Sequence, residues 1–211
     1  MTTIICVLRS GGDFKPEHVF RLKRQVDQYG TFVCLTDQPQ DLGGISTFPL
    51  IADYPGWWSK VSIFAIYGPV LYLDLDVNIM GDLTPIIEAI PRYQFITCRS
   101  LWEPDLDPYL NSSVTGWSGD ISLLLRSFME DPNFAILGLR LDKWLQEWAL
   151  PWASIKTTFW QDICPDMICS YNRLVDLGNV DLSNCRILVS QCNPRPWEYG
   201  GADDCMRSQI R

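Results

Sequence analysis

Two aspartates follow a short apolar segment in the first half of the chain. Residues 70–73 are apolar or aromatic with high strand propensity, and Asp74 and Asp76 come next with one residue between them. Side chains two residues apart in a strand point to the same side. Both carboxylates can therefore face one point, and two such oxygen donors suit a divalent cation that also binds a diphosphate. The alternative is that the two aspartates are simply solvated at the end of a strand.

An apolar strand of this kind belongs to a sheet that buries both of its faces, as parallel sheets do. The start of the chain supplies a matching unit, with a strand predicted over residues 2–8, a helix ending near residue 29 and a strand over 31–37. Strand, helix and strand in this order predict parallel strands with a right-handed connection. Further strands or helices are predicted at 45–49, 58–67, 83–90, 94–98, 111–117, 120–129, 139–148 and 187–189. We therefore expect an α/β fold with a mostly parallel central sheet flanked by helices, and ligands at the carboxyl ends of its strands.

Polar residues also follow the other predicted strands. The first strand leads into a turn with Gly11 and Gly12, where the missing side chains allow a ligand to approach the backbone. The second strand ends in the hydroxyl of Thr36 and the carboxylate of Asp37. Lys60 falls in the first turn of a predicted helix, where the helix dipole does not favour a cation. An anionic partner would explain Lys60 at this place, although an ordinary surface lysine is the alternative.

Length and charge limit the classes of function. The 211 residues are 47% hydrophobic, enough for one sizeable domain, which we expect over residues 1–198 with a loose tail over 199–211. A formal net charge of −8 argues against a surface that binds nucleic acid by neutralising phosphates. No segment has the pattern of a signal peptide or a membrane span, and the eight cysteines contain no C-x-x-C pair. These features predict a cytoplasmic protein with reduced thiols.

Nine tryptophans are many for a chain of this length. Several lie in loop-like sequence, where an exposed indole can stack on a sugar or a base: Trp57, Trp58, Trp102, Trp117 and Trp197. The alternative is that tryptophans fill the core and its rim, and we expect this for most of them.

Four motifs occur in order along most of the chain. They are the apolar strand with Asp-x-Asp at 70–76, Asn-Ser-Ser-Val-Thr-Gly-Trp at 111–117, Gln-Asp at 161–162 and Asn-Pro-Arg-Pro-Trp-Glu at 193–198. Together they resemble the motifs of GT-A fold glycosyltransferases of family 8, the glycogenin and lipopolysaccharide galactosyltransferase type. Residues 7–12 and 56–60 look like those of a subgroup of small transferases from bacteria and phages. The resemblance implies a single GT-A domain that transfers a sugar from a nucleotide-sugar.

The sequence departs from the family pattern at three places. Ser113 stands where the family has Gly, and Trp160 stands where the family has the first Asp of an Asp-Gln-Asp segment. The family's terminal loop begins with a His that ligates manganese, and Gln191 takes that place here. The resemblance therefore implies a Mn²⁺ or Mg²⁺ site formed by Asp74, Asp76 and Gln191, in which the two carboxylates contribute most of the binding.

The resemblance also implies roles for the other candidate residues. The base and ribose of the donor would lie against Leu8, Arg9, Ser10, Thr36 and Asp37. The donor sugar would face Asn111, Ser112 and Ser113, with Gln161 and Asp162 near its anomeric carbon or its hydroxyls. The charge that develops on the leaving diphosphate would be neutralised by Lys60 and Arg195.

The expected activity is metal-dependent transfer of a sugar, with retention of configuration, from a nucleotide-sugar such as a UDP-sugar. A glycan or a lipid-linked saccharide is the default acceptor, and a protein side chain or a modified base of phage DNA is the alternative. Inversion would need a carboxylate base, for which Asp162, Glu103 and Asp105 are candidates. Two other hypotheses stay open: a nucleotide-sugar-binding protein without transfer activity, and a nucleotide-sugar hydrolase that uses the same metal site.

Overall fold

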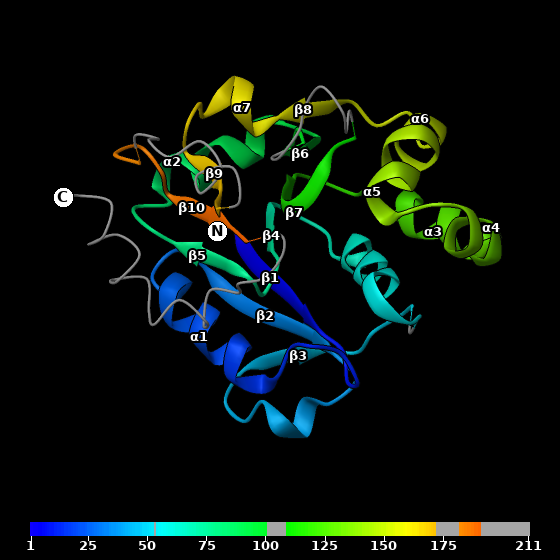
Figure 1. The fold of residues 1–211 in the computed structure, drawn as a ribbon, viewed down its shortest axis with the longest axis horizontal. Helices are drawn as coiled ribbons and strands as arrows, with labels where there is room; N and C mark the ends of the chain where they lie inside the picture. Colours follow the sequence, from blue (N-terminus) through cyan, green and yellow to red (C-terminus); the bar gives the residue numbers. More distant parts are fainter. Residues whose placement is uncertain (53, 101–108, 172–181, 191–211) are drawn as a thin grey trace.

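The computed structural model describes residues 1–52, 54–100, 109–171 and 182–190. In this part of the chain a large sheet contains β1 (Thr3–Leu8), β2 (Thr31–Thr36), β3 (Ser46–Phe48), β4 (Val70–Leu73), β6 (Phe95–Cys98), β7 (Asn111–Trp117) and β8 (Thr157–Phe159). Their order across the sheet is β3-β2-β1-β4-β7-β6-β8 (Figure 1). A smaller sheet contains, in spatial order, β5 (Val77–Ile79), β10 (Ile187–Val189) and β9 (Ile168–Ser170).

Helices connect and flank the strands (Figure 1). The longer ones are α1 (Pro16–Val26), the 3-10 helix η2 (Gly56–Ala65), α2 (Thr84–Ala89), α3 (Ser122–Glu130) and α4 (Pro132–Gly138). The shorter ones are η1 (Pro39–Asp41), η3 (Ile90–Arg92), α5 (Leu141–Trp144), η4 (Leu145–Ala149), α6 (Leu150–Trp152) and α7 (Trp160–Ile163). Within the described ranges no helix has the length and apolar character needed to span a bilayer.

Two apolar cores cover the two faces of the large sheet. Successive residues of β1 alternate between them, so that Ile4 packs into the core under α1 and Ile5 into the core under η2 and α3. In the second core Trp58, Phe128 and Trp144 pack against one another with ring centroids between 5.3 and 5.9 Å apart. The α/β fold with helices on both faces of a mostly parallel sheet, as predicted from the sequence, is confirmed.

The large sheet is parallel except at β7. β1 pairs in parallel with β2 and β4, β2 with β3, and β6 with β8, whereas β7 runs antiparallel to both β4 and β6. In this register Leu73 lies opposite Val114, and the amide of Asp74 donates to the carbonyl of Ser113 at 2.9 Å. The reversed direction of β7 therefore brings the start of this strand beside the carboxyl end of β4.

The small sheet brings a third segment to the same place. β10 pairs antiparallel with β5, which begins at Val77, and parallel with β9. Directly after β10 the amide of Ser190 donates to the carbonyl of Asp76 at 3.3 Å. The backbone of residues 74–76 is thus held on one side by β7 and on the other by the end of β10.

The structure differs from the predicted elements in several places. The helix predicted over 58–67 is the 3-10 helix η2, which begins two residues earlier. The helix predicted over 139–148 starts with α5 and then widens into a π-helical turn, η4, before α6. β5 and β9 were not predicted, because they have three residues each and are too short to show an alternating pattern. α4 was also not predicted, although the carboxylate of Asp131 caps its first turn by accepting from the amide of Phe134 at 3.0 Å.

Candidate functional site

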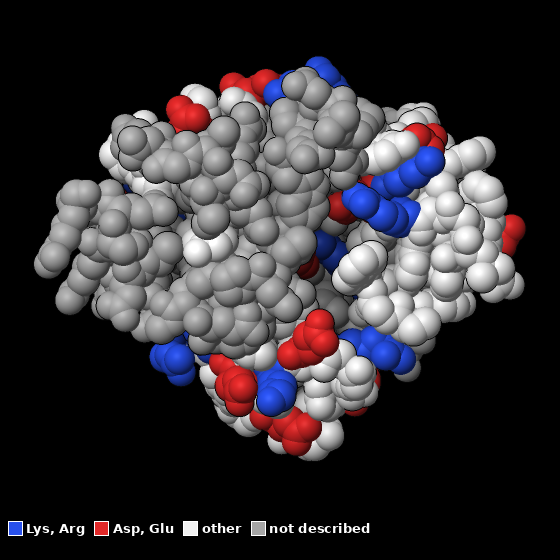
Figure 2. Space-filling view, viewed as in Figure 1, with Lys and Arg blue, Asp and Glu red and all other residues white. Residues whose placement is uncertain are grey.

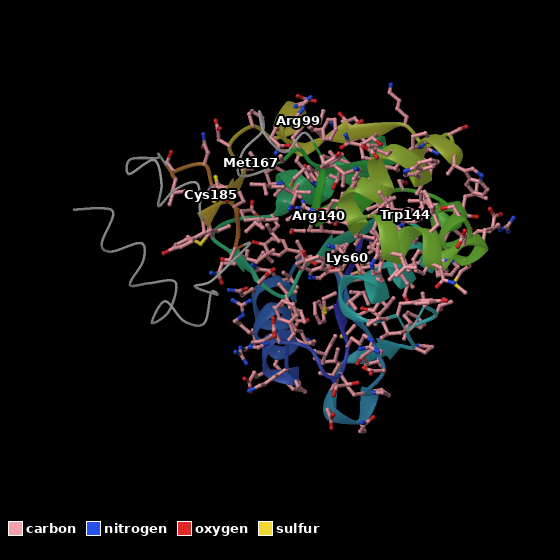
Figure 3. All side chains as sticks on the ribbon, turned by 45° about the vertical axis from the view of Figure 1, so that its right-hand side comes forward. Lys60, Arg99, Arg140, Trp144, Met167 and Cys185 are labelled. Carbon is pink, nitrogen blue, oxygen red and sulfur yellow. The ribbon has the colours of Figure 1, made fainter. Side chains whose placement is uncertain are left out.

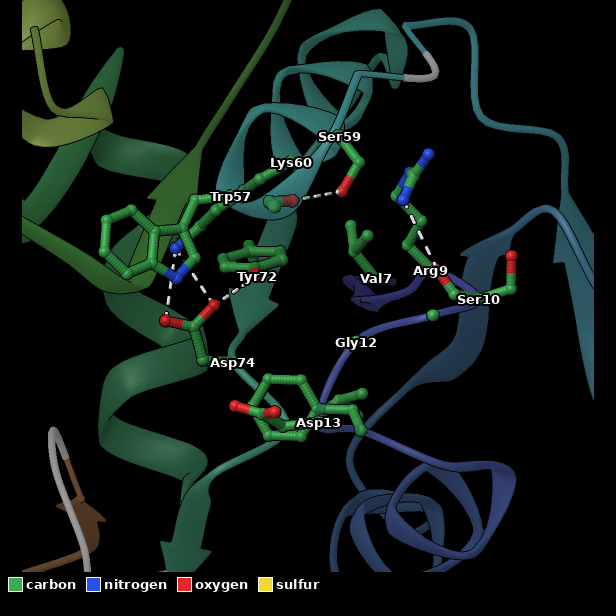
Figure 4. Close-up of a pocket in the computed structure, with 14 residues that line it drawn as sticks. Val7, Arg9, Ser10, Gly12, Asp13, Trp57, Ser59, Lys60, Tyr72 and Asp74 are labelled. Carbon is green, nitrogen blue, oxygen red and sulfur yellow. Dashed lines mark hydrogen bonds and ion pairs between the residues drawn. The ribbon is translucent and has the colours of Figure 1, made fainter. Parts of the chain in front are cut away.

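Two adjoining cavities open at the carboxyl ends of β1 and β4. The first, of about 250 Å³, lies between the turn after β1 and the start of η2 (Figure 4). The second, of about 190 Å³, lies between the end of β4, the start of β7 and α5. Four residues line both: Phe14, Trp57, Lys60 and Asp74. The two cavities form one bipartite site, and Figure 2 shows acidic and basic atoms within a hollow near the centre of this face.

The carboxylates of Asp74 and Asp76 both line the second cavity. Lys60 Nζ donates to the two carboxylate oxygens of Asp74 at 2.9 and 3.2 Å, and the hydroxyl of Tyr72 donates to the same carboxylate (Figure 4). The ammonium also lies 4.6 Å from the centre of the Tyr72 ring. Burial raises the pKa of Tyr72 well above its usual value, and the charge of Asp74 raises it further. One cation, one phenol and two carboxylates thus gather at the end of β4.

Lys60 belongs to the buried stretch of η2, in which residues 58–64 are all buried. Its stem cannot lie in solvent, so the interpretation of Lys60 as an ordinary surface lysine is wrong. The anionic partner that its position calls for is Asp74 in this structure. The ammonium of Lys60 lies beside a ligand cavity. An anionic group of a ligand could therefore replace the carboxylate of Asp74 as its partner.

The turn after β1 forms one wall of the first cavity, where Arg9 and Ser10 line it. Ser10 donates to the carboxylate of Asp37 through its amide, at 2.9 Å, and also through its hydroxyl. Burial raises the pKa of Asp37, but these hydrogen bonds outweigh burial and hold the pKa below its usual value. Asp37 therefore fixes the turn, whereas Leu8 and Thr36 are buried and line neither of the two cavities.

The start of β7 forms the polar wall of the second cavity, where Asn111, Ser112 and Ser113 all line it. Asn111 Oδ1 accepts from the amide of Ser113 at 3.1 Å. Ser112 donates to the carboxylate of Asp142 through its hydroxyl and, at 3.3 Å, through its amide. Asp142 also lines the cavity, and burial raises its pKa although Lys60 opposes the shift. Sequence analysis missed Asp142, because an acidic residue in an amphipathic helix is usually solvated.

Ser190 lies at the edge of the second cavity, directly after β10. It is 1% exposed, and its hydroxyl has no hydrogen-bond partner among the described residues. A buried hydroxyl without a partner in a polar cavity fits a ligand that supplies one. Sequence analysis did not identify Ser190, which directly precedes the predicted metal ligand Gln191. Several predicted residues lie outside the described part of the chain: Gln191, Arg195, Glu103, Asp105 and the tail over 199–211.

The second cavity fits a divalent cation that is bound together with a diphosphate. Asp74 and Asp76 supply hard oxygen donors, and the hydroxyl of Ser190 is a neutral oxygen beside them. In the described ranges no three His, Cys, Asp or Glu side chains form a group that could hold a metal by themselves. An ion here would therefore take further ligands from phosphates or water. Lys60 would also have to give up one of its two hydrogen bonds to the carboxylate of Asp74, so that this oxygen could bind the ion.

The Gln-Asp segment lies in α7 and contacts β6 instead of the two cavities. Gln161 Oε1 accepts from the amide of Arg99 at 3.0 Å, and Arg99 donates to both carboxylate oxygens of Asp162 at 2.6 and 2.8 Å. Arg99 lies beside α7, apart from Lys60 (Figure 3). Trp160, which replaces an aspartate of the family pattern, is fully buried and donates through Nε1 to the carbonyl of Val114 at 3.1 Å. Neither Gln161 nor Asp162 lines either cavity.

The tryptophans separate into two groups. Trp58 and Trp117 are buried in the core, as expected for most of them. Trp57 is 73% exposed and lines both cavities at the point where they meet. Trp102 and Trp197 lie outside the described residues. Trp57 is therefore the indole among these that can reach a ligand in the bipartite site.

No protein-family model and no curated protein matches the chain. The galactosyltransferase LgtC, solved with donor and acceptor sugar analogs, is similar in structure, with a TM-score of 0.60, 11% identity and coverage of 92% of this chain and 89% of that one. The glycosyltransferase GlyE of Streptococcus pneumoniae TIGR4 gives a TM-score of 0.63 and 15% identity over 93% of this chain and 57% of that one.

A glycosyltransferase involved in glycosylation of the major capsid of PBCV-1 is also similar, with a TM-score of 0.55 and 14% identity over 93% of this chain and 95% of that one. At these identities the likeness concerns the fold alone. The chain has the GT-A fold that these glycosyltransferases share, in agreement with the fold implied by its sequence motifs.

Proposed function

We propose that the chain is a glycosyltransferase that moves a sugar from a nucleotide-sugar to the hydroxyl of an acceptor with the help of a divalent cation. One observation carries the proposal: Asp74 and Asp76 line a polar cavity at the carboxyl end of β4, and this cavity adjoins another at the end of β1. Open α/β sheets bind ligands at this place. The fold shared with solved glycosyltransferases supports the proposal.

The nucleotide is assigned to the first cavity. Gly11 has a φ of 76°, so the turn after β1 exposes its backbone in a conformation that a larger side chain disfavours. Arg9 and Ser10 flank this turn and offer donors, with Ser10 oriented by Asp37. Uridine is the proposed base, on the strength of the sequence motifs.

The diphosphate is assigned to the junction of the two cavities, where Lys60 and Asp74 lie. A Mn²⁺ or Mg²⁺ ion held by Asp74 and Asp76 would supply charge neutralisation to the leaving diphosphate. Lys60 keeps a positive charge at the same place and stabilises the phosphate oxygens as the bond to the sugar breaks. Arg195 is proposed as a second cation and Gln191 as a third metal ligand, both from the sequence motifs.

The donor sugar is assigned to the second cavity, against Asn111, Ser112 and Ser113. Retention of configuration is proposed, so no carboxylate base beside the acceptor is required, and the leaving phosphate accepts the proton of the acceptor hydroxyl. Gln161 and Asp162 are proposed to approach the sugar, for which they would exchange their contacts with Arg99 for contacts with its hydroxyls. A glycan or a lipid-linked saccharide is the proposed acceptor.

The test is a thermal-shift panel of nucleotide-sugars with and without Mn²⁺, followed by product analysis with glycan acceptors. We expect one nucleotide-sugar to raise Tm in a manner that depends on Mn²⁺, and a product whose anomeric configuration, measured by NMR, equals that of the donor. Binding without turnover would identify a nucleotide-sugar-binding protein instead. Release of free sugar at the same rate with and without acceptor would identify a hydrolase, and an inverted product would contradict retention.

A further inference from the structure

The second cavity is small and rich in negative charge. Its volume is about 190 Å³. Three carboxylates line it, those of Asp74, Asp76 and Asp142, and Lys60 is the one lysine or arginine among its described lining residues. The ammonium of Lys60 donates to Asp74, 2.9 Å away. The polar groups on the facing wall come from the neutral residues of β7 and from Ser190.

Asp142 differs from the other two carboxylates in what surrounds it. Asp74 and Asp76 would be balanced by Lys60 and by the proposed cation once a donor is bound. The hydrogen bonds recorded for the carboxylate of Asp142 come from Ser112, whose hydroxyl and amide are neutral donors. Lys60 opposes the rise in the pKa of Asp142, but among the described residues no cation forms an ion pair with this carboxylate.

Asp142 is also held rigidly. It belongs to α5, where Leu141 and Trp144 on either side of it are buried in the second core. Ser112, its partner, lies in β7 at the centre of the polar wall. A carboxylate anchored in this way has little freedom to move away from a second negative charge in the cavity.

We propose that Asp142 makes the donor-sugar pocket selective for a neutral sugar, because its carboxylate accepts hydrogen bonds from sugar hydroxyls and repels the carboxylate of a uronic acid. The inference rests on the proposed function, since it assumes that the second cavity holds the donor sugar. Asp142 is a specificity residue in this scheme and takes no part in breaking the bond to the diphosphate. Like charges in a partly buried site oppose each other strongly, whereas a hydroxyl in the same position donates to the carboxylate.

The test compares pairs of nucleotide-sugars that differ in one group. UDP-glucose and UDP-glucuronate differ at carbon 6, which is a hydroxymethyl in one and a carboxylate in the other, and UDP-galactose and UDP-galacturonate form a second pair. We expect the wild type to show a kcat/KM at least about tenfold higher for the neutral member of the pair it uses, a difference of about 1.4 kcal/mol. In Asp142→Asn, which keeps an acceptor oxygen for Ser112, we expect this ratio to fall at least fivefold.

The matched control is Glu147→Gln, which replaces a carboxylate by an amide on the next turn of the same helical segment. Glu147 pairs with Lys143 at 3.9 Å, is exposed and does not line the cavity, so the ratio should stay at the wild-type value. A wild type that uses both members of a pair equally overturns the inference and leaves the proposed function intact. An Asp142→Asn variant that folds, by circular dichroism, but keeps the wild-type ratio also overturns it. A protein that neither binds nor turns over any donor contradicts the proposed function, and the inference falls with it.

Discussion

Two of the aspartate–cation pairs among the described residues differ in their surroundings. Lys60 and Asp74 meet at the junction of the two cavities, where their side chains are 11% and 25% exposed. Arg99 and Asp162 meet beside α7, where their side chains are 48% and 49% exposed. The exposed pair has the better geometry, since the guanidinium binds both carboxylate oxygens at 2.6 and 2.8 Å. Geometry alone therefore does not indicate which pair is suited to chemistry.

Burial makes the difference. A charge pair in a partly closed cavity is poorly screened, so a bound anion or cation changes the energy of both partners strongly. An exposed pair is screened by water and salt and contributes little. Lys60 and Asp74 can therefore respond to a diphosphate and a metal ion, whereas Arg99 and Asp162 hold α7 to the end of β6.

The largest effect is expected for Asp74→Asn and Asp76→Asn. An amide cannot provide the charge that the proposed ion requires, so turnover of the donor should fall at least about 100-fold. Asp76→Asn should keep its fold by circular dichroism, and neither variant should show the Mn²⁺-dependent rise in Tm with donor that we expect for the wild type. Undiminished wild-type activity in EDTA, or full activity in either variant, would refute the assignment of the metal.

Lys60→Met should produce two changes of opposite sign. The ammonium now competes with any metal ion for Asp74, so removing it should tighten Mn²⁺ binding, measured by calorimetry without donor. Turnover should still fall by at least about tenfold, because a positive charge near the diphosphate is lost. Lys23→Met is the control, since Lys23 pairs at 2.6 Å with Asp27 at the end of α1 and lines neither cavity. Weaker Mn²⁺ binding in Lys60→Met would show that Lys60 supports the ion instead of competing with it.

Part of this comparison could be predicted from the sequence. The apolar run before Asp74 identifies β4 and places Asp74 and Asp76 at its end, because strand period and sheet type are local properties. Lys60 could be identified because a cation in the first turn of a helix is unfavourable, although its partner could not be predicted. Asp142 was not found, since its contact with Ser112 joins residues 30 positions apart through the reversed direction of β7. Pattern alone does not fix such a contact.

Ser190 and Arg99 show the same limit. Ser190 follows β10, which the sequence predicts at 187–189, but its partner strands β5 and β9 have three residues each and leave no periodic signal. The motif at 161–162 resembles a family segment, yet in this structure its side chains contact Arg99, which no motif singled out. A motif predicts residue types at a strand or helix end, but the partner of each residue depends on packing between distant elements.

Trp57→Ala should have the next largest effect. Its indole stands at the junction of the two cavities, and loss of one stacking contact should raise KM for the donor by about tenfold with little change in kcat. Trp152→Ala is the control, because Trp152 is also exposed, at 50%, and lines neither cavity. Both variants should keep the wild-type Tm within a few degrees. An unchanged KM in Trp57→Ala would show that the indole does not contact the donor.

Asp142→Asn should raise Tm at neutral pH. Burial raises the pKa of Asp142 in the folded protein, so its contribution to stability is fully present below the pKa of the unfolded chain and is lost as pH rises through the folded pKa. At neutral pH the charged carboxylate therefore lowers the free energy of unfolding, and the neutral amide of Asn removes this destabilisation. The rise in Tm over wild type should be a few degrees at pH 7 and should vanish below about pH 4. A lower Tm at pH 7 would mean that the attraction to Lys60 exceeds the cost of burial.

The smallest effect on Tm among the charge variants is expected for Asp162→Asn. The hydrogen bonds from Arg99 lower the pKa of Asp162 in the folded protein. Its contribution to stability is thus present above the pKa of the unfolded chain, about 3.9, and is lost as pH falls through the lower folded pKa. Because both partners are half exposed, the loss of Tm at pH 7 should be less than about 2 °C and should disappear as pH falls below the folded pKa.

The same variant decides what the exposed pair does. If Arg99 and Asp162 only hold α7 to β6, turnover by Asp162→Asn should stay within about threefold of the wild type. If Asp162 leaves Arg99 to contact the donor sugar, as the sequence motif implies, turnover should fall at least tenfold while Tm stays nearly constant. The second result would show that a residue of an exposed ion pair can also act on the substrate. Burial would then not distinguish the pair that takes part in the reaction from the pair that does not. The first would restrict the chemistry to the cavity that Lys60 and Asp74 line.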